Sequence, residues 1–132
     1  MAESIRKRGA IILGGTGTPF KPEVGHLHFA LKDVDSNGFI LLAPVGTKKP
    51  NSDLSCVLQV GHHPFIRHES VILYARLRLM KYGHIVSALR NGNAHLAEAM
   101  SPDLHTRVCA CLRKSKLSPG WAKKYLGKNG EW

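Results

Sequence analysis

Short apolar runs separated by turn residues fill the first hundred positions of the chain. Runs of this length, bounded by Gly, Pro, Asn and Asp, predict β-strands. The turn between the second and third runs contains Asn37 and Gly38, and Asn-Gly is the strongest short signal for a hairpin. We expect strands within residues 9–13, 26–33, 38–45, 53–60 and 70–80, and a further apolar run lies at 84–89.

The second run, residues 26–33, alternates between apolar and polar side chains. Successive side chains of a strand point to opposite faces of the sheet. Its two leucines and its phenylalanine therefore share one face, and His26 and His28 lie side by side on the other. The pattern predicts a half-buried strand that carries two histidines on its outer face.

The pattern changes at Ser101, where helix signals begin. Residues 101–103, Ser-Pro-Asp, supply a capping hydroxyl, a proline for the first helical position and an acid at the positive end of the helix dipole. The apolar positions that follow have helical spacing and share one face: Leu104, Val108, Cys111 and Leu112. The pair at 118–119, Ser-Pro, predicts a second short helix with the apolar contacts Trp121, Tyr125 and Leu126.

Together these elements predict a single domain over residues 1–132. Its class is mainly β, with a core over about 9–100 and a C-terminal helical segment over about 101–127. We expect α-helix as the main element only after Ser101. Five or more short strands with tight turns favour a small antiparallel β-barrel closed by the C-terminal helices.

The net charge of the chain indicates what kind of partner it binds. The chain has 19 Lys and Arg against 9 Asp and Glu, a net charge of +10, which indicates a polyanionic partner such as RNA, DNA or an acidic protein. No apolar run approaches the roughly 20 residues needed to cross a bilayer, and no signal-type apolar region follows the basic N-terminus. We therefore expect a cytoplasmic protein with no membrane contact. The three cysteines, an odd number, argue against a disulfide framework.

Residues 61–74, Gly-His-His-Pro-Phe-Ile-Arg-His-Glu-Ser-Val-Ile-Leu-Tyr, are the densest concentration of reactive side chains. Imidazole, guanidinium and hydroxyl groups exchange protons or bind phosphates near neutral pH. Pro64 pushes the residue before it into an extended conformation, so we expect His63 to be presented on a turn rather than buried.

The order of the elements resembles the PemK/MazF-type toxins, which are small basic SH3-like barrels that cleave RNA without a metal. The shared order is a short first strand, a Gly-rich loop, the strand pair 26–33 and 38–45, and a late helix. The family's catalytic hydroxyl stands in a Pro-Ile-Thr-Ser type segment. Here residues 44–47 read Pro-Val-Gly-Thr, so Gly46 takes the usual threonine place and the hydroxyl is on Thr47. The family's arginine at the start of the second strand has no counterpart in residues 25–28, Gly-His-Leu-His.

Metal-independent RNA cleavage needs a base, an acid and cations that stabilise charge on phosphorus. The catalytic candidates are His63, Arg67, Ser70, His28 and Thr47. The candidates for contacts with nucleic acid are His26, Lys48, Lys49, His62, His68, Arg76 and Arg78. Paired histidines are also metal ligands, but beyond Glu69 no cysteine or carboxylate stands at matching spacing, so we expect neither metal nor cofactor.

Two functions of different classes fit these residues. The first is a metal-independent endoribonuclease toxin that cleaves single-stranded RNA and is held in check by an antitoxin protein. The second is a non-catalytic barrel module that binds nucleic acid or protein, and a homodimer stays open under both. Catalysis requires that histidines from 26 and 28 and from 62, 63 and 68 meet in one pocket, whereas binding does not.

Overall fold

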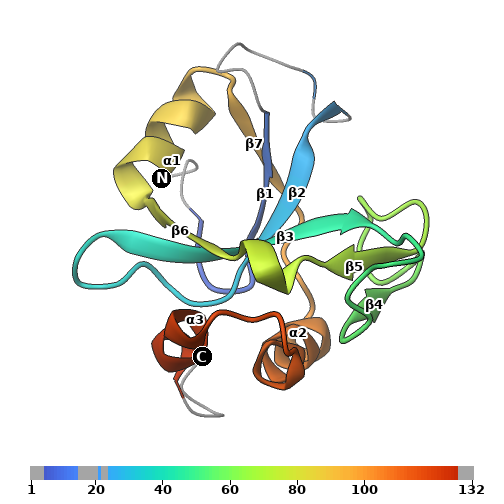
Figure 1. Cartoon of the computed structure of the whole chain (residues 1–132). Coiled ribbons are helices and arrows are strands. Elements are labelled where there is room, and N and C mark those ends of the chain that lie inside the picture. The colour runs from blue at the N-terminus through green and yellow to red at the C-terminus, as the bar shows by residue number, and fades with distance from the viewer. Residues whose placement is uncertain (1–4, 15–20, 22–23, 128–132) are drawn as a thin grey trace.

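An antiparallel sheet is the frame of the computed structural model, which describes residues 5–14, 21 and 24–127 (Figure 1). Seven strands run in the order β4-β5-β3-β2-β1-β7, with β6 paired to β3. The expectation of five or more strands before residue 100 is confirmed. The Gly-rich loop of the expected order lies mostly outside the described residues. The strands are β1 (Ala10–Leu13), β2 (His26–Ala30), β3 (Phe39–Thr47), β4 (Val57–Leu58), β5 (Ser70–Ile72), β6 (Arg78–Lys81) and β7 (Ala94–Ala97).

The sheet does not close on itself within the described ranges. Strands β4 and β7 are its two ends, and β6 pairs only with β3. The class predicted from the sequence, mainly β with C-terminal helices, is confirmed, whereas the closed barrel is not. The hairpin between β2 and β3 has the predicted turn, in which Gly38 adopts a φ of +85° and the Asp35 carboxylate accepts hydrogen bonds from the backbone N–H groups of Asn37 and Phe39.

Strand β3 has nine residues and pairs with three other strands. One edge faces β2, and the other faces first β6 and then β5. Leu42 pairs with Arg78, and Val45 pairs with Ile72. These two pairs are three positions apart along β3 but six positions apart along the partner segment. The three extra residues form a 3₁₀ helix, η2 (Tyr74–Arg76). The single strand expected over 70–80 is therefore wrong, because the chain leaves the sheet in its middle.

Three helices complete the structure: α1 (Tyr82–Arg90), α2 (Pro102–Lys114) and α3 (Gly120–Leu126). The predicted start of α2 is confirmed, because the Ser101 hydroxyl accepts a hydrogen bond of 3.1 Å from the Leu104 N–H. Helix α3 follows Pro119 as expected. The prediction of Trp121 as an apolar contact is wrong: its side chain is 43% exposed, and Ala122 is buried instead. No helix in the described part of the chain is long and apolar enough to cross a membrane.

The central strands β1 and β2 and most of β3 are buried on both faces of the sheet, which the alternation in the second run did not indicate. Helices α2 and α3 lie together on one side, and α1 lies at the opposite end of the molecule (Figure 1). Phe29 belongs to the core beneath α2 and α3, while its neighbour Ala30 belongs to a second core that contains Ile85 of α1. The second strand is therefore not half exposed.

Helix α1 contradicts the expectation that helix is the main element only after Ser101. The run at 84–89 is too short for its length alone to separate strand from helix. In the structure Ile85 is fully buried, and Ala88 and Leu89, three and four positions later, pack against the same core. This spacing is helical. The core into which these side chains pack is formed by strands that are distant in the sequence.

Two glycine substitutions test the hairpin and the helix with opposite signs. An added methyl group meets nothing within 4 Å at either Gly38 or Gly83. Gly38→Ala should destabilise the fold by about 1 kcal/mol, because Gly38, unlike Gly83, has a positive φ. Gly83→Ala should stabilise it by up to about 1 kcal/mol, because Gly83 lies inside α1. Urea unfolding measures both, and destabilisation by Gly83→Ala would contradict the helix.

Candidate functional site

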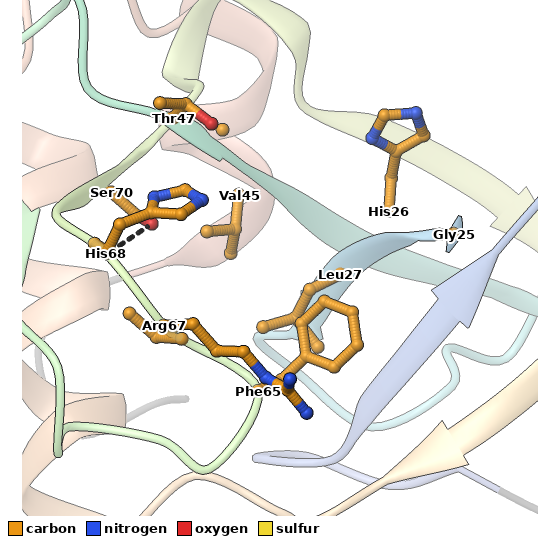
Figure 2. Close-up of a pocket in the computed structure, with 11 residues that line it drawn as sticks. Gly25, His26, Leu27, Val45, Thr47, Phe65, Arg67, His68 and Ser70 are labelled. Carbon is orange, nitrogen blue, oxygen red and sulfur yellow. Dashed lines mark hydrogen bonds between the residues drawn. The ribbon is translucent and has the colours of Figure 1, made fainter. Parts of the chain in front are cut away.

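A hollow of about 300 Å³ opens where the start of β2, the end of β3 and the segment before β5 meet (Figure 2). His26 is the first residue of β2, and Thr47 is the last of β3. Antiparallel pairing places these two ends side by side, and the pair Thr47↔Ser70 brings in the third segment. The lining residues are Gly25, His26, Leu27, Val45, Gly46, Thr47, Phe65, Ile66, Arg67, His68 and Ser70.

One histidine from each predicted group reaches this hollow. His26 and His68 line it from opposite sides (Figure 2). His28, His62 and His63 do not line it. Of the predicted catalytic residues, Thr47, Arg67 and Ser70 are present. The two histidines in the hollow are therefore ones that the sequence indicated as contacts with nucleic acid.

The contacts of His68 leave one of its ring nitrogens free to act as a base. Nδ1 lies 3.2 Å from the backbone oxygen of Glu69, and because a carbonyl can only accept, Nδ1 carries the proton. Nε2 then has the lone pair. The Ser70 hydroxyl donates a hydrogen bond of 2.9 Å to the backbone oxygen of His68 and is 3% exposed. Ser70 therefore holds the His68 backbone in place.

Arg67 brings a positive charge that no protein group in the described ranges neutralises. Its side chain is exposed and has no hydrogen bond or ion pair with the described residues. No acidic residue of the described ranges lines the hollow. A guanidinium in such surroundings is available to an anion.

Gly46 lies close to the Leu73 side chain. A Cβ atom at Gly46 would lie 3.0 Å from Cδ1 of Leu73, closer than ordinary contact. The threonine found at this place in the resembling toxins would therefore press against Leu73. Thr47, one position later, is exposed and has room for its side chain.

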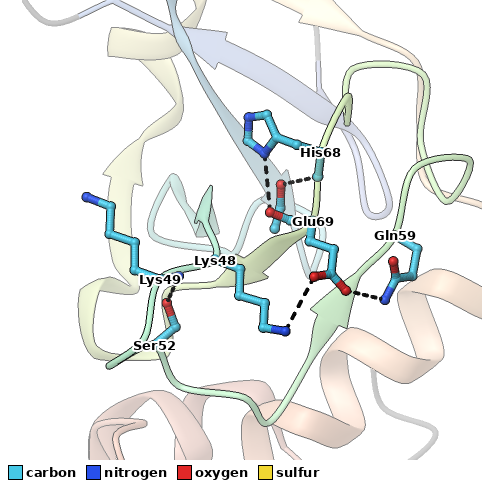
Figure 3. Close-up of polar contacts among 7 residues, drawn as sticks. Lys48, Lys49, Ser52, Gln59, His68 and Glu69 are labelled. Carbon is cyan, nitrogen blue, oxygen red and sulfur yellow. Dashed lines mark hydrogen bonds and ion pairs between the residues drawn. The ribbon is translucent and has the colours of Figure 1, made fainter.

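A polar network beside the hollow engages one of the two predicted lysines (Figure 3). The Glu69 carboxylate accepts a hydrogen bond of 2.8 Å from the Gln59 amide and forms an ion pair of 3.4 Å with Lys48. These two contacts, the Gln59 hydrogen bond first, lower the pKa of Glu69. The ammonium of Lys49 takes no part in this network, so Lys49 is the freer of the two for an external anion.

The expectation that His63 is presented on a turn is wrong. Its side chain is 3% exposed and lies edge-on to Phe29, with ring centroids 5.4 Å apart. Nδ1 accepts a hydrogen bond of 3.1 Å from the Phe65 N–H, so Nε2 carries the proton and donates it to the backbone oxygen of Glu98. Pro64 does form a turn, but the turn folds the ring inward. His63 thus joins this loop to the segment after β7.

His28 is also buried, at 5% exposure, and does not lie on an open outer face. Its Nδ1 is 2.9 Å from the backbone oxygen of His26. Burial, aided by the positive charge of Arg78, lowers the pKa of His28 to about 4, against the opposing effect of that hydrogen bond. His28 is therefore neutral at pH 7 and lines a second hollow with His26, Arg76 and Arg78.

His62, a further candidate for contact with nucleic acid, lies away from both hollows. His62 is exposed, and its Nδ1 accepts a hydrogen bond of 2.8 Å from the Gln59 N–H, outside both hollows. Phe65 and Val45 line the first hollow, and the sequence offered no chemical signal for either. Across residues 5–14, 21 and 24–127, no group of three or more His, Cys, Asp or Glu is arranged to hold a metal ion.

Comparison with known proteins adds no assignment. No family model matches the chain, and no curated protein matches it. The resemblance to PemK/MazF-type toxins therefore stays an interpretation of the sequence.

His63→Ala should destabilise the protein by about 2–4 kcal/mol. The substitution removes a buried ring and leaves a backbone donor and acceptor without partners. Chemical denaturation measures the loss. His62→Ala, at the exposed neighbouring position, is the control and should change stability by no more than about 0.5 kcal/mol. Equal effects of the two substitutions would show that His63 is not part of the core.

The pH dependence of stability tests the burial of His28. Its pKa is lower in the folded chain than in the unfolded chain, so the unfolded chain binds more protons between the two values. Stability should be complete above about pH 6.5 and should fall by roughly 3 kcal/mol as the pH drops to 4. His28→Gln should lose this part of the pH dependence, whereas His62→Gln should keep it. Identical pH profiles for His28→Gln and the wild type would contradict the assignment.

Proposed function

We propose that this chain is a metal-independent endoribonuclease that cleaves single-stranded RNA, a toxin on an SH3-like barrel of the PemK/MazF type. The observation that carries the proposal is the first hollow. It gathers two histidines, a threonine hydroxyl and an arginine that has no ion pair with a described residue, and no acid of the described part of the chain lines it. These groups match the base, acid and cation that cleavage of a phosphodiester requires.

In the proposed reaction, His68 Nε2 takes the proton from a ribose 2′-hydroxyl. The 2′-oxygen attacks phosphorus, the bond from phosphorus to the 5′-oxygen breaks, and a 2′,3′-cyclic phosphate forms. His26, on the opposite side of the hollow, gives a proton to the departing 5′-oxygen. Arg67 stabilises the negative charge that builds on the phosphate oxygens, and the Thr47 hydroxyl donates a hydrogen bond to one of them.

The catalytic groups of the PemK/MazF-type toxins stand at places in the fold that correspond to this hollow. The toxins have a hydroxyl at the end of one strand and an arginine at the start of another. Here Thr47 ends β3 and His26 starts β2, so both places contribute to one hollow. The missing arginine is replaced by Arg67, which comes from the loop before β5. The net charge of +10 favours RNA as the polyanion. An antitoxin that restrains this activity in the cytoplasm is part of the proposal.

Cleavage of a mixed single-stranded RNA in EDTA tests the function. The wild type should cleave it and leave a 2′,3′-cyclic phosphate. Arg67→Ala and His68→Ala should each reduce the rate by ~10²–10⁴, because they remove charge stabilisation and the base. Their melting temperatures should stay close to that of the wild type, because both side chains are exposed.

Two controls sharpen this test. His62→Ala should cleave at the wild-type rate, because His62 lies outside the hollow. An RNA with a single 2′-deoxy sugar at the cleaved link should resist every variant, because the nucleophile is gone. Full activity of both Arg67→Ala and His68→Ala would refute the assigned roles. RNA binding without any cleavage would favour the non-catalytic module.

A further inference from the structure

A second hollow of about 280 Å³ adjoins the first and shares His26 and Val45 with it. Arg76 of η2 and Arg78 of β6 are among its lining residues. Apolar side chains, among them Pro44 and Leu73, form part of its wall. The hollow therefore combines two cations with an apolar surface next to the proposed reaction site.

The three residues that leave the sheet as η2 create this arrangement. Arg76 is the last residue of η2, and Arg78 is the first of β6, opposite Leu42 of β3. The 3₁₀ helix is tied to α2 because the Tyr74 hydroxyl donates a hydrogen bond of 2.7 Å to the backbone oxygen of Val108. The two arginines are thus presented by an anchored turn at the end of a strand.

Both guanidinium groups lack a protein partner in the part of the chain that the structure describes. Arg76 and Arg78 are exposed, and neither side chain forms a hydrogen bond or ion pair with a described residue. Within residues 5–14, 21 and 24–127, no acid lines the second hollow. Arg78 stands close enough to His28 for its charge to disfavour protonation of that ring. Two like charges gathered at one hollow repel each other, and an anion between them would relieve that repulsion.

We propose that the second hollow binds the phosphate of the nucleotide next to the cleaved link, held by Arg76 and Arg78. This inference rests on the proposed function, since it places a neighbouring phosphate of the same RNA strand. His26 borders both hollows, so one strand passes from the first to the second without leaving the surface. Pro44 and Leu73 offer an apolar wall to the ribose and base, which are accessible in this way only in a single strand.

The site is tested by binding and cleavage with the double variant Arg76→Gln/Arg78→Gln. Binding uses an eight-nucleotide RNA with 2′-O-methyl sugars, which cannot be cleaved, over a range of salt concentrations. The log–log salt slope should become shallower by roughly 0.7 for each phosphate that the variant no longer neutralises. The control variant Lys116→Gln/Lys124→Gln removes the same amount of charge from exposed positions outside both hollows. Its salt slope should differ from that of the wild type by less than half of the change expected for the arginine variant.

Substrate length separates this site from the reaction site. The wild type should cleave the eight-nucleotide RNA with a higher kcat/KM than a dinucleotide, which has only the phosphate that reacts. The arginine variant should lose that advantage and cleave the dinucleotide as the wild type does. An RNA with one uncharged methylphosphonate beside the cleaved link should bind the wild type more weakly, by about as much as the two arginine substitutions weaken binding. The same methylphosphonate should cause little further loss of affinity in the arginine variant.

The possible results discriminate between the two proposals. A wild type that cleaves RNA, with an unchanged salt slope in the arginine variant, overturns the second site and leaves the proposed function standing. A wild type that binds RNA without cleaving it, with a shallower slope in the arginine variant only, overturns the nuclease and supports the phosphate site. An equally shallow slope in the lysine variant, or impaired dinucleotide cleavage in the arginine variant, overturns the second site.

Discussion

The pairing of one strand with three others is the constraint on which the structure depends. Strand β3 has β2 along one edge and β6 and then β5 along the other. Every backbone hydrogen-bonding group buried in a core requires a partner, and β3 finds its partners in three separate parts of the chain. Its interior residues Leu41 and Leu42 belong to different cores on opposite faces. The strand therefore joins the helices on the two sides of the sheet into one fold.

Strand β3 also determines where the two hollows lie. Both hollows open beside its C-terminal half, near the start of β2. At the first hollow, β3 is paired with β5 through Val45, Gly46 and Thr47. The interruption of the partner strand by η2 borders the second hollow, to which it contributes Arg76. Functional groups far apart in sequence are thus held by strand ends that the sheet makes rigid.

Burial divides the histidines by role. His63 and His28 are enclosed, and each donates a hydrogen bond to a backbone carbonyl, so both belong to the fold rather than to a reactive surface. His26 and His68 are exposed and line one hollow, so a ligand there can contact their rings. Among the described residues no acid lines either hollow, and Glu69, beside the first one, pairs with Lys48. Arg67, Arg76 and Arg78 therefore bring positive charge to the two hollows without an ion pair to a described residue.

Local sequence determined the features that depend on neighbours in the chain. The turn at Gly38, the cap at Ser101, the β-rich class and the basic charge followed from a few adjacent residues, because backbone preference and charge are local properties. The tertiary structure alone decided that the run at 84–89 is helical, that His63 turns inward, and which histidines meet. Those outcomes depend on the partner that a segment finds across the sheet, and one sequence pattern allows several partners. The polar stretch at 61–74 marked the site from the sequence, but only the packing around Phe29 and Leu73 separated its structural residues from its reactive ones.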